Sequence, residues 1–290
     1  MSQSVAADAA EGGTVFAGHA AVAGPRSWQR AFGDLRQGWR QRPLWGYLGW
    51  QDIKQRYRRS VLGPLWISIS MGVIALAMGV LYAALFKRPV ADFLPYLATG
   101  LLIWRFIEGC ILEGSEVFIA NEGLIRFLPA PLSLHVYRLV WRQTLFFLHN
   151  LVIWGLLMII FPQSLGWSLL LAIPAFAVLM INGAWIAIVA GIVATRFRDI
   201  PPIIASLTQL LFFMTPIVWS YEILKDNLAE RARFVELNPA MHFVEILRQP
   251  LLGDAIVWRH WWIAGAITAV GCAAALICLR QYRSRVAYWV

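Results

Sequence analysis

The chain has 290 residues, of which 59% are hydrophobic and only 14% are charged, and its formal net charge is +9. A mean hydropathy of +0.62 excludes an ordinary soluble domain of this length. We therefore interpret the sequence as an all-α, polytopic integral membrane protein, because helices satisfy their own backbone hydrogen bonds in lipid. The basic excess favours contact with anionic lipid over binding of nucleic acid.

The N-terminal segment, residues 1–25, is rich in small residues. It contains two acids, Asp8 and Glu11, and no lysine or arginine. It therefore lacks the basic start and the apolar centre of a signal peptide. With so little apolar surface to bury, we expect it to form a disordered tail.

Residues 26–60 have the pattern of amphipathic helices at a membrane interface. Trp28, Phe32 and Trp39 recur at helical spacing with arginines between them, and Pro43 ends this run. A second basic and aromatic stretch follows up to Tyr57. An apolar face opposite a basic face is typical of a helix that lies in the interface. Two interpretations remain open, a simple lipid anchor and a lever that contacts a cytoplasmic partner.

Six apolar segments follow, each close to the roughly 20 residues that a helix needs to cross a bilayer. They lie at about 61–86, 93–118, 138–161, 168–194, 201–220 and 261–280. We assign residues 61–285 to one transmembrane domain with six spans. Of the 25 lysines and arginines, 17 fall on the side that carries both termini. The excess of basic residues identifies that side as cytoplasmic.

The second span contains four charged residues, Arg105, Glu108, Glu113 and Glu116. At 100° per residue they fall within an arc of about 140°. Charges facing lipid are costly, so this arc should face protein or water. Arg105 and Glu108 are spaced for an ion pair. The sequence leaves three interpretations open: a structural ion pair, the wall of a wet cavity or pathway, and a weaker one, a proton relay.

The longest connection, 221–260, separates the last two spans. Asn238 and Pro239 form a helix-start signal. The following run to Leu252 is amphipathic, with Glu245 and Arg248 as its charged residues, and it is too short to cross a bilayer. We expect short re-entrant or interfacial outer helices here. The alternative is an ordinary capped helix on the surface.

The chain has 15 tryptophans and three cysteines. Belt anchoring at the two interfaces explains most of the tryptophans. Trp154 and Trp185 lie in mid-span, where aromatic faces could line a pore that passes a sugar chain. The cysteines fall inside apolar segments without the spacing of metal ligands, so we expect no metal site.

No motif for nucleotide hydrolysis or for catalysis occurs in the sequence. The GxxxxGK[ST] phosphate loop is absent, so this chain alone should not hydrolyse ATP. The HExxH and GxSxG motifs are also absent, and no catalytic residue is assigned. These absences make an enzyme a poor interpretation.

Four segments resemble, in order, the membrane permeases of polysaccharide ABC exporters, the Wzm-like family of O-antigen, capsule and teichoic-acid permeases. The first is DIKQRYRRSVLGPLW, residues 52–66, and the second is NEGLIRFLP, residues 121–129. The third combines Arg198-Asp199-Ile200 with Thr215-Pro216-Ile217, and the fourth begins at Asn238-Pro239. The resemblance covers about residues 44–285. Pro131, two residues after Pro129, departs from the family pattern, which has one proline here.

The resemblance implies a transmembrane subunit of an ATP-driven exporter in the bacterial inner membrane. Two permease copies would pair with two copies of a separate cytoplasmic ATPase, which would bind ATP and Mg²⁺. This chain would bind no cofactor. A channel lined partly by aromatic residues would conduct a lipid-linked glycan.

The resemblance also implies roles for particular residues. A coupling element docking on the ATPase would contain Asn121, Glu122, Leu124, Ile125, Arg126, Phe127 and Pro129. A helix against that ATPase, residues 45–59, would contain Asp52, Arg56, Tyr57 and Arg59. An outer gate within residues 223–252 would contain Asn238, Pro239, Glu245 and Arg248.

Arg56 and Arg59 could also attract the pyrophosphate of a lipid carrier, since a guanidinium binds phosphate oxygens in a bidentate manner. The alternative is simple anchoring to phospholipid. Two other functions are kept as alternatives: a membrane-embedded enzyme or assembly factor of glycan synthesis, and a permease of the same architecture for a small lipid or drug.

Overall fold

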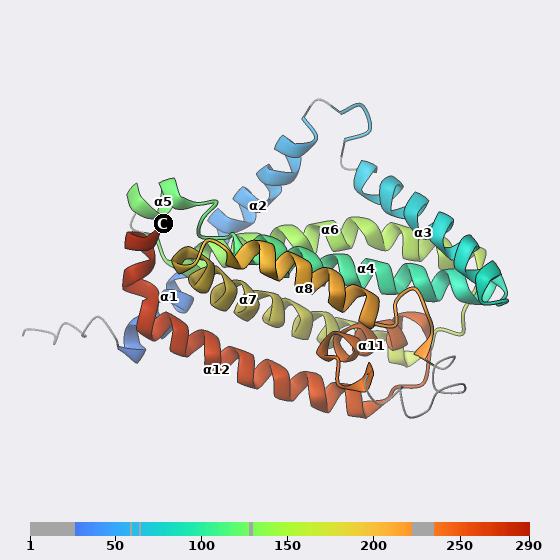
Figure 1. Ribbon diagram of the computed structural model, residues 1–290. Coiled ribbons are helices and arrows are strands. Elements are labelled where there is room, and N and C mark those ends of the chain that lie inside the picture. Colours follow the sequence, from blue (N-terminus) through green and yellow to red (C-terminus); the bar gives the residue numbers. More distant parts are fainter. Residues whose placement is uncertain (1–26, 59, 64, 128–129, 222–234) are drawn as a thin grey trace, which may run out of the picture.

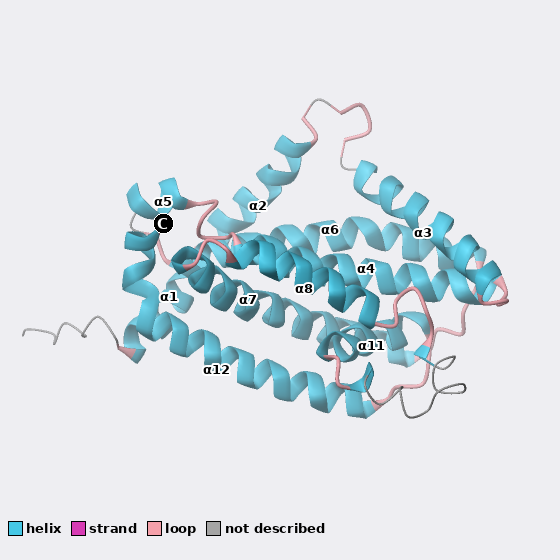
Figure 2. Cartoon of the chain, in the orientation of Figure 1, coloured by secondary structure: helices cyan, strands magenta, loops and turns pink. Residues whose placement is uncertain are grey.

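The computed structural model describes residues 27–58, 60–63, 65–127, 130–221 and 235–290. Within these residues every regular element is a helix, which confirms the all-α prediction (Figure 2). The predictions made for residues 1–25, for Arg59, for Pro129 and for residues 223–234 of the outer connection lie outside the described residues.

Five helices are long and apolar enough to cross a membrane within the described residues. They are α3 (Leu65–Leu85), α4 (Val90–Ser115), α6 (Leu132–Ile160), α7 (Ala172–Arg196, continuing the 3₁₀ turn η1, Trp167–Leu171) and α12 (Trp258–Trp289). This agrees with a polytopic membrane protein.

The helix at the predicted fifth span, α8 (Ile200–Met214), has 15 residues. At 1.5 Å per residue it is about 22 Å long, shorter than the roughly 30 Å hydrocarbon core. It ends where Thr215 takes an extended conformation before Pro216, as residues that precede proline usually do. The predicted end near residue 220 is therefore wrong, and the number of six spans stays a prediction.

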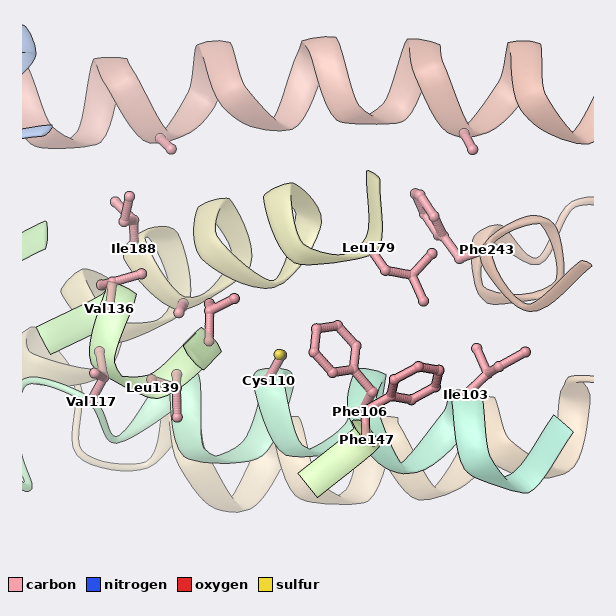
Figure 3. Packing of buried hydrophobic residues seen from close by; sticks show 14 of the residues in the cluster. Ile103, Phe106, Cys110, Val117, Val136, Leu139, Phe147, Leu179, Ile188 and Phe243 are labelled. Carbon is pink, nitrogen blue, oxygen red and sulfur yellow. The ribbon is translucent and has the colours of Figure 1, made fainter. Parts of the chain in front are cut away.

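α4 lies at the centre of the bundle and packs against α3, α6, α7, α8 and α11. On one side Phe106 of α4, Phe147 of α6 and Phe176 of α7 form an aromatic cluster, with ring centroids 5.0 Å apart for Phe106–Phe176 and 4.4 Å for Phe147–Phe176. Figure 3 shows Phe106 and Phe147 close together in this core, beside Cys110. Small residues let α4 and α7 approach closely, since a Cβ added to Gly114 would lie 2.9 Å from that of Ala187.

Two helices precede the first long one, α1 (Trp28–Arg40) and α2 (Arg42–Arg56). The face of α1 that packs on the bundle is formed by Ala31, Asp34 and Gly38, while its tryptophans and Phe32 are exposed. α2 packs along α6, and α2 and α3 slant away from the other helices to meet at their connecting loop (Figure 1).

The helix after Asn238, α11 (Pro239–Leu252), is almost entirely buried, between α4, α7, α12 and η1. The alternative of an ordinary surface helix is therefore wrong. Its apparent amphipathic pattern misleads because the charged side chain of Arg248 is paired inside the protein, at 1% exposure. Asn238 caps the helix by accepting a hydrogen bond from the Ala240 N–H at 2.9 Å.

Candidate functional site

Four charged side chains join α2 to α6 and α4. Arg138 Nε of α6 lies 2.9 Å from Asp52 Oδ2 of α2, and its Nη2 contacts the other carboxylate oxygen. Arg142, one turn further along α6, donates to the same Asp52 Oδ2 at 2.9 Å and pairs through Nη2 with Glu113 of α4. These four residues, Asp52, Arg138, Arg142 and Glu113, are called the ion network below. It ties α2 to two long helices of the bundle.

The Asp52 side chain is 15% exposed, and its carboxylate stays ionised because of its partners. Burial alone would raise the pKa of Asp52, but the hydrogen bonds and charges of Arg138 and Arg142 outweigh that effect and hold the pKa below its ordinary value. The pairing therefore contributes stability above the ordinary pKa of about 4. That contribution is lost only as the pH falls through the lowered pKa.

Two cavities lie beside the ion network. The first, of about 310 Å³, is lined by residues of α3, α4 and α6 together with Arg56 and Tyr57, and includes Arg105, Glu108 and Asn150. The second, of about 500 Å³, is lined by the ion network with Arg56, Glu116, Asn121 and His135. Arg56, Glu113 and Phe146 line both, so the two cavities adjoin.

Buried polar groups without a partner face these cavities. Among the described residues, both ring nitrogens of His135 and the Oδ1 atom of Asn150 have no hydrogen-bond partner, although the side chains are 2% and 6% exposed. Buried polar groups left unpaired cost free energy unless water or a ligand satisfies them. His135 lines the second cavity and Asn150 lines the first, so each cavity has a buried polar side chain in its wall besides its charged residues.

Arg105 and Glu108 form the ion pair that their spacing predicted, with 2.7 Å between Nη1 and Oε2. The Arg105 side chain is 63% exposed, while Glu108 is 27% exposed. Glu113 is paired with Arg142, so Glu108 and Glu113 are each held by an arginine. Glu116, the third acid of this helix region, lines the second cavity.

Arg56 reaches deep along the bundle. Its guanidinium lies against Phe146, which is 14 residues after Leu132, the first residue of α6. Fourteen residues of helix correspond to about 21 Å. α2 therefore does not lie flat across the end of the bundle, and the guanidinium of Arg56, 5.4 Å from the Phe146 ring centre, sits at the depth of the apolar helices.

The short helix α5 (Glu122–Phe127) contains most of the predicted coupling element and has no buried residue. Phe127 is 84% exposed and Leu124 is 42% exposed. Arg126 pairs with Glu122 at 3.0 Å and also donates to the Val290 carbonyl oxygen at the end of α12. The Asn121 side chain instead donates to the Val117 carbonyl at 2.7 Å. α5 thus presents an apolar tip while it is tied to α12 (Figure 1).

Asp34 of α1 holds the same end of the molecule together. Its carboxylate accepts hydrogen bonds from the Leu132 and Ser133 N–H groups at 3.1 and 2.9 Å, which caps α6, and it pairs with Arg283 of α12 at 2.6 Å. The middle of α1, the start of α6 and the C-terminal part of α12 therefore meet at the end of the molecule where α5 lies. The first described residues and Val290 lie at this end, which the charge distribution predicts to be cytoplasmic.

The predicted outer-gate residues come together at the opposite end. Arg248 donates to the Pro216 carbonyl at 2.8 Å, pairs with Glu245 and lies 4.0 Å above the Tyr96 ring. Asn238 donates to Thr215 Oγ1 at 2.9 Å. These hydrogen bonds join α11 to Thr215 and Pro216, the two residues that follow α8. The role of this cluster as a gate stays a prediction.

The two mid-span tryptophans pack within the chain. Trp154 donates to the Leu251 carbonyl at 2.9 Å, and Trp185 donates to Asn182 Oδ1 at 2.6 Å. The two cavities described above are lined by phenylalanine rather than tryptophan. Trp154 and Trp185 line neither cavity, so these two positions do not support a conduit lined by tryptophan.

Sequence reasoning missed Asp34, Arg138 and Arg142 as site residues. Asp34 was not singled out, and the two arginines were counted only among the basic residues that set the topology. The signal for Arg138 and Arg142 was their i, i+4 spacing, which places both on one face of α6. No local pattern links them to Asp52, which is 86 residues from Arg138 in the sequence.

Comparison with known proteins gives a consistent result. The ABC-2 type transporter family matches residues 43–252. An O-antigen export system permease protein RfbA of Klebsiella pneumoniae is 22% identical over 218 residues, which cover 75% of this chain and 79% of that protein. The protein of the same name from Myxococcus xanthus is 25% identical over 189 residues, covering 65% and 72%.

Proposed function

The chain belongs to the ABC-2 type transporter family, and we propose that it is the transmembrane permease subunit of an ATP-driven exporter of a lipid-linked polysaccharide. The observation that carries this proposal is the similarity to O-antigen export system permeases over three quarters of the chain. The two cavities beside the central helix support it, because charged and polar side chains in their walls could hydrogen-bond a glycan inside the bilayer. The expected location is the inner membrane of a bacterium.

A separate ATPase supplies the energy in this proposal, because the sequence contains no phosphate loop. α5 is the element that would contact it. Its exposed Leu124 and Phe127 form an apolar tip of the kind that inserts into a groove of a partner. Two ATPase copies and two permease copies form the complete exporter in this proposal, and the exposed apolar faces of α3 and α8 are among the surfaces that a second permease copy could cover.

Motion of the ATPase reaches the bundle by two routes. The first runs from α5 through Arg126 to the end of α12. The second runs from α2 through Asp52 to α6 and α4 by the ion network. Each route contains a charged side chain that joins two helices. A displacement of α2 would change the two cavities, which Arg56 of α2 lines.

Reversing the charge at Arg126 should lower permease-stimulated ATP turnover at least threefold, because a carboxylate in place of the guanidinium would repel Glu122 and lose the hydrogen bond to Val290. The measurement is ATP hydrolysis by the purified permease–ATPase complex. The matched control is Arg36→Glu, an exposed position on α1 at the same end of the molecule. Turnover at the wild-type level in Arg126→Glu would contradict the coupling role of α5.

Arg56 is the residue best placed to meet an anionic lipid head group. It borders both cavities at the depth of the apolar helices. An arginine there would bind pyrophosphate oxygens through charge-assisted hydrogen bonds. Arg56→Gln should raise about tenfold the concentration of lipid-linked glycan that half-maximally stimulates ATP turnover, while basal turnover stays unchanged. An unchanged half-maximal concentration would remove this role and leave phospholipid anchoring.

A further inference from the structure

A third cavity lies apart from the two cavities beside the ion network, at the α5 end of the molecule between the ends of α7 and α12. It has a volume of about 540 Å³ and is lined by Arg196, Ser284, Arg285, Tyr288 and Trp289. Arg196 stacks near the Trp289 ring, with 5.7 Å between the guanidinium carbon and the ring centre. The cavity therefore combines two guanidinium groups with hydroxyl groups and aromatic rings.

The position of Arg196 shows at which level of the membrane this cavity lies. Residues 172–195 of α7 contain no charged side chain, and Arg196 is the first charge where that apolar stretch ends. The hydrocarbon core ends where such a stretch ends, and the phosphate groups of the lipids lie just beyond it. Arg196 is therefore placed at the level of the phospholipid phosphates.

An apolar stripe on α12 leads to the same cavity. Val270 is 73% exposed and Ile277 is 45% exposed. At 100° per residue, Val270, Ile277, Ser284 and Tyr288 fall within an arc of about 40° on one face of the helix. An acyl chain lying along Val270 and Ile277 would bring its own phosphate to Ser284 and Arg285.

We propose that this cavity binds the phosphate of an anionic phospholipid, whose acyl chain lies along the exposed stripe of α12. Arg196 and Arg285 pair with the phosphate oxygens, as basic pockets at the cytoplasmic ends of membrane helices do. Ser284 and Tyr288 supply hydroxyl donors, and Trp289 flanks the head group. A free phosphate or a soluble phosphate ester would contact the guanidinium groups alone, whereas a lipid would also cover the exposed Val270 and Ile277. This proposal does not depend on what the chain transports.

The bound lipid would also act on the neighbouring coupling region. Trp289 lines the cavity, and the next residue, Val290, accepts the hydrogen bond of Arg126 from α5. A head group that holds the end of α12 in place therefore holds the contact between α12 and α5. The class of ligand is an anionic phospholipid of the surrounding leaflet.

The test is lipid retention by the full-length purified protein, measured by native mass spectrometry after titration with phosphatidylglycerol. Arg196→Gln combined with Arg285→Gln should weaken retention of the lipid about 30-fold, because the double variant loses two basic contacts at the membrane surface. The matched control is Lys87→Gln combined with Arg88→Gln, an equal loss of charge at exposed positions between α3 and α4 at the other end of the molecule, which should leave this site unchanged. Phosphatidylcholine should be retained far less than phosphatidylglycerol by the wild type.

Three results would overturn the proposal. They are equal retention of phosphatidylglycerol by the wild type and the Arg196/Arg285 double variant, equal retention of phosphatidylcholine and phosphatidylglycerol, and displacement of the lipid by millimolar inorganic phosphate. If the double variant does not assemble, Ser284→Glu replaces it, because Ser284 is exposed and a carboxylate there must repel the head group. Undiminished retention in Ser284→Glu would then refute the site.

Discussion

Asp52→Lys is expected to reduce ATP-driven export at least tenfold. In the wild type the Asp52 carboxylate is shared between Arg138 and Arg142, and its side chain is only 15% exposed. A lysine would place a third positive charge against two guanidinium groups in a partly buried site, where like charges repel strongly. α2 would then separate from α6, and a displacement of α2 would no longer be transmitted to the other helices. The measurement is the amount of exported polysaccharide in cells with matched levels of the permease.

The charge reversal has a direct rescue. Adding Arg138→Glu to Asp52→Lys restores an opposite pair between α2 and α6, and Arg142 keeps its partner Glu113. This double variant should recover a substantial part of the export. Asp92→Lys is the matched control, because Asp92 is exposed at the far end of α4. Wild-type export by Asp52→Lys, or no recovery in a correctly assembled double variant, would contradict the proposed role of the ion network.

The second large effect is expected at Arg248. This arginine is 1% exposed, and it pairs with Glu245 while donating to the Pro216 carbonyl. Arg248→Met would leave the Glu245 carboxylate buried without its partner. Breaking a buried ion pair from one side costs about 3–5 kcal/mol of stability. We therefore expect a lower midpoint of thermal unfolding for the purified protein in detergent.

The matched variant is Glu245→Gln combined with Arg248→Met. Removing both charges avoids the uncompensated carboxylate, so the double variant should be more stable than Arg248→Met alone. Equal unfolding midpoints for the wild type and Arg248→Met would show that Arg248 does not fasten α11 to the chain break at Pro216. A double variant no more stable than Arg248→Met would show that the lost stability comes from packing instead.

Patterns within one helix could be predicted from the sequence, and contacts between distant helices could not. The apolar lengths located the long helices, and the three-residue spacing located the Arg105–Glu108 pair. The ion network joins residues that are 29 to 90 positions apart, and nothing local marks which acid meets which arginine. Asp34 was missed for the same reason, because its partners lie 98 residues or more away.

The outer helix shows a different limit of sequence patterns. α11 carries charged residues at helical spacing, which is typical of a surface helix in water. In this fold the charges are neutralised inside the protein, so the same pattern belongs to a buried helix. The end of α8 was misplaced because Thr215-Pro216 lies within an apolar run, and hydropathy alone does not show that the helix stops there. The helix ends there because Pro216 restricts the backbone of Thr215, although the sequence remains apolar.

The central claim is that this chain forms the passage of an exporter that a separate ATPase drives. The most direct test places the purified permease and its ATPase in proteoliposomes with a lipid-linked polysaccharide and measures how much of the glycan becomes accessible to an enzyme on the opposite side. We predict movement of the glycan that requires the permease, the ATPase and ATP together. Glycan movement by the permease without the ATPase, or none when the assembled complex hydrolyses ATP, would contradict the claim.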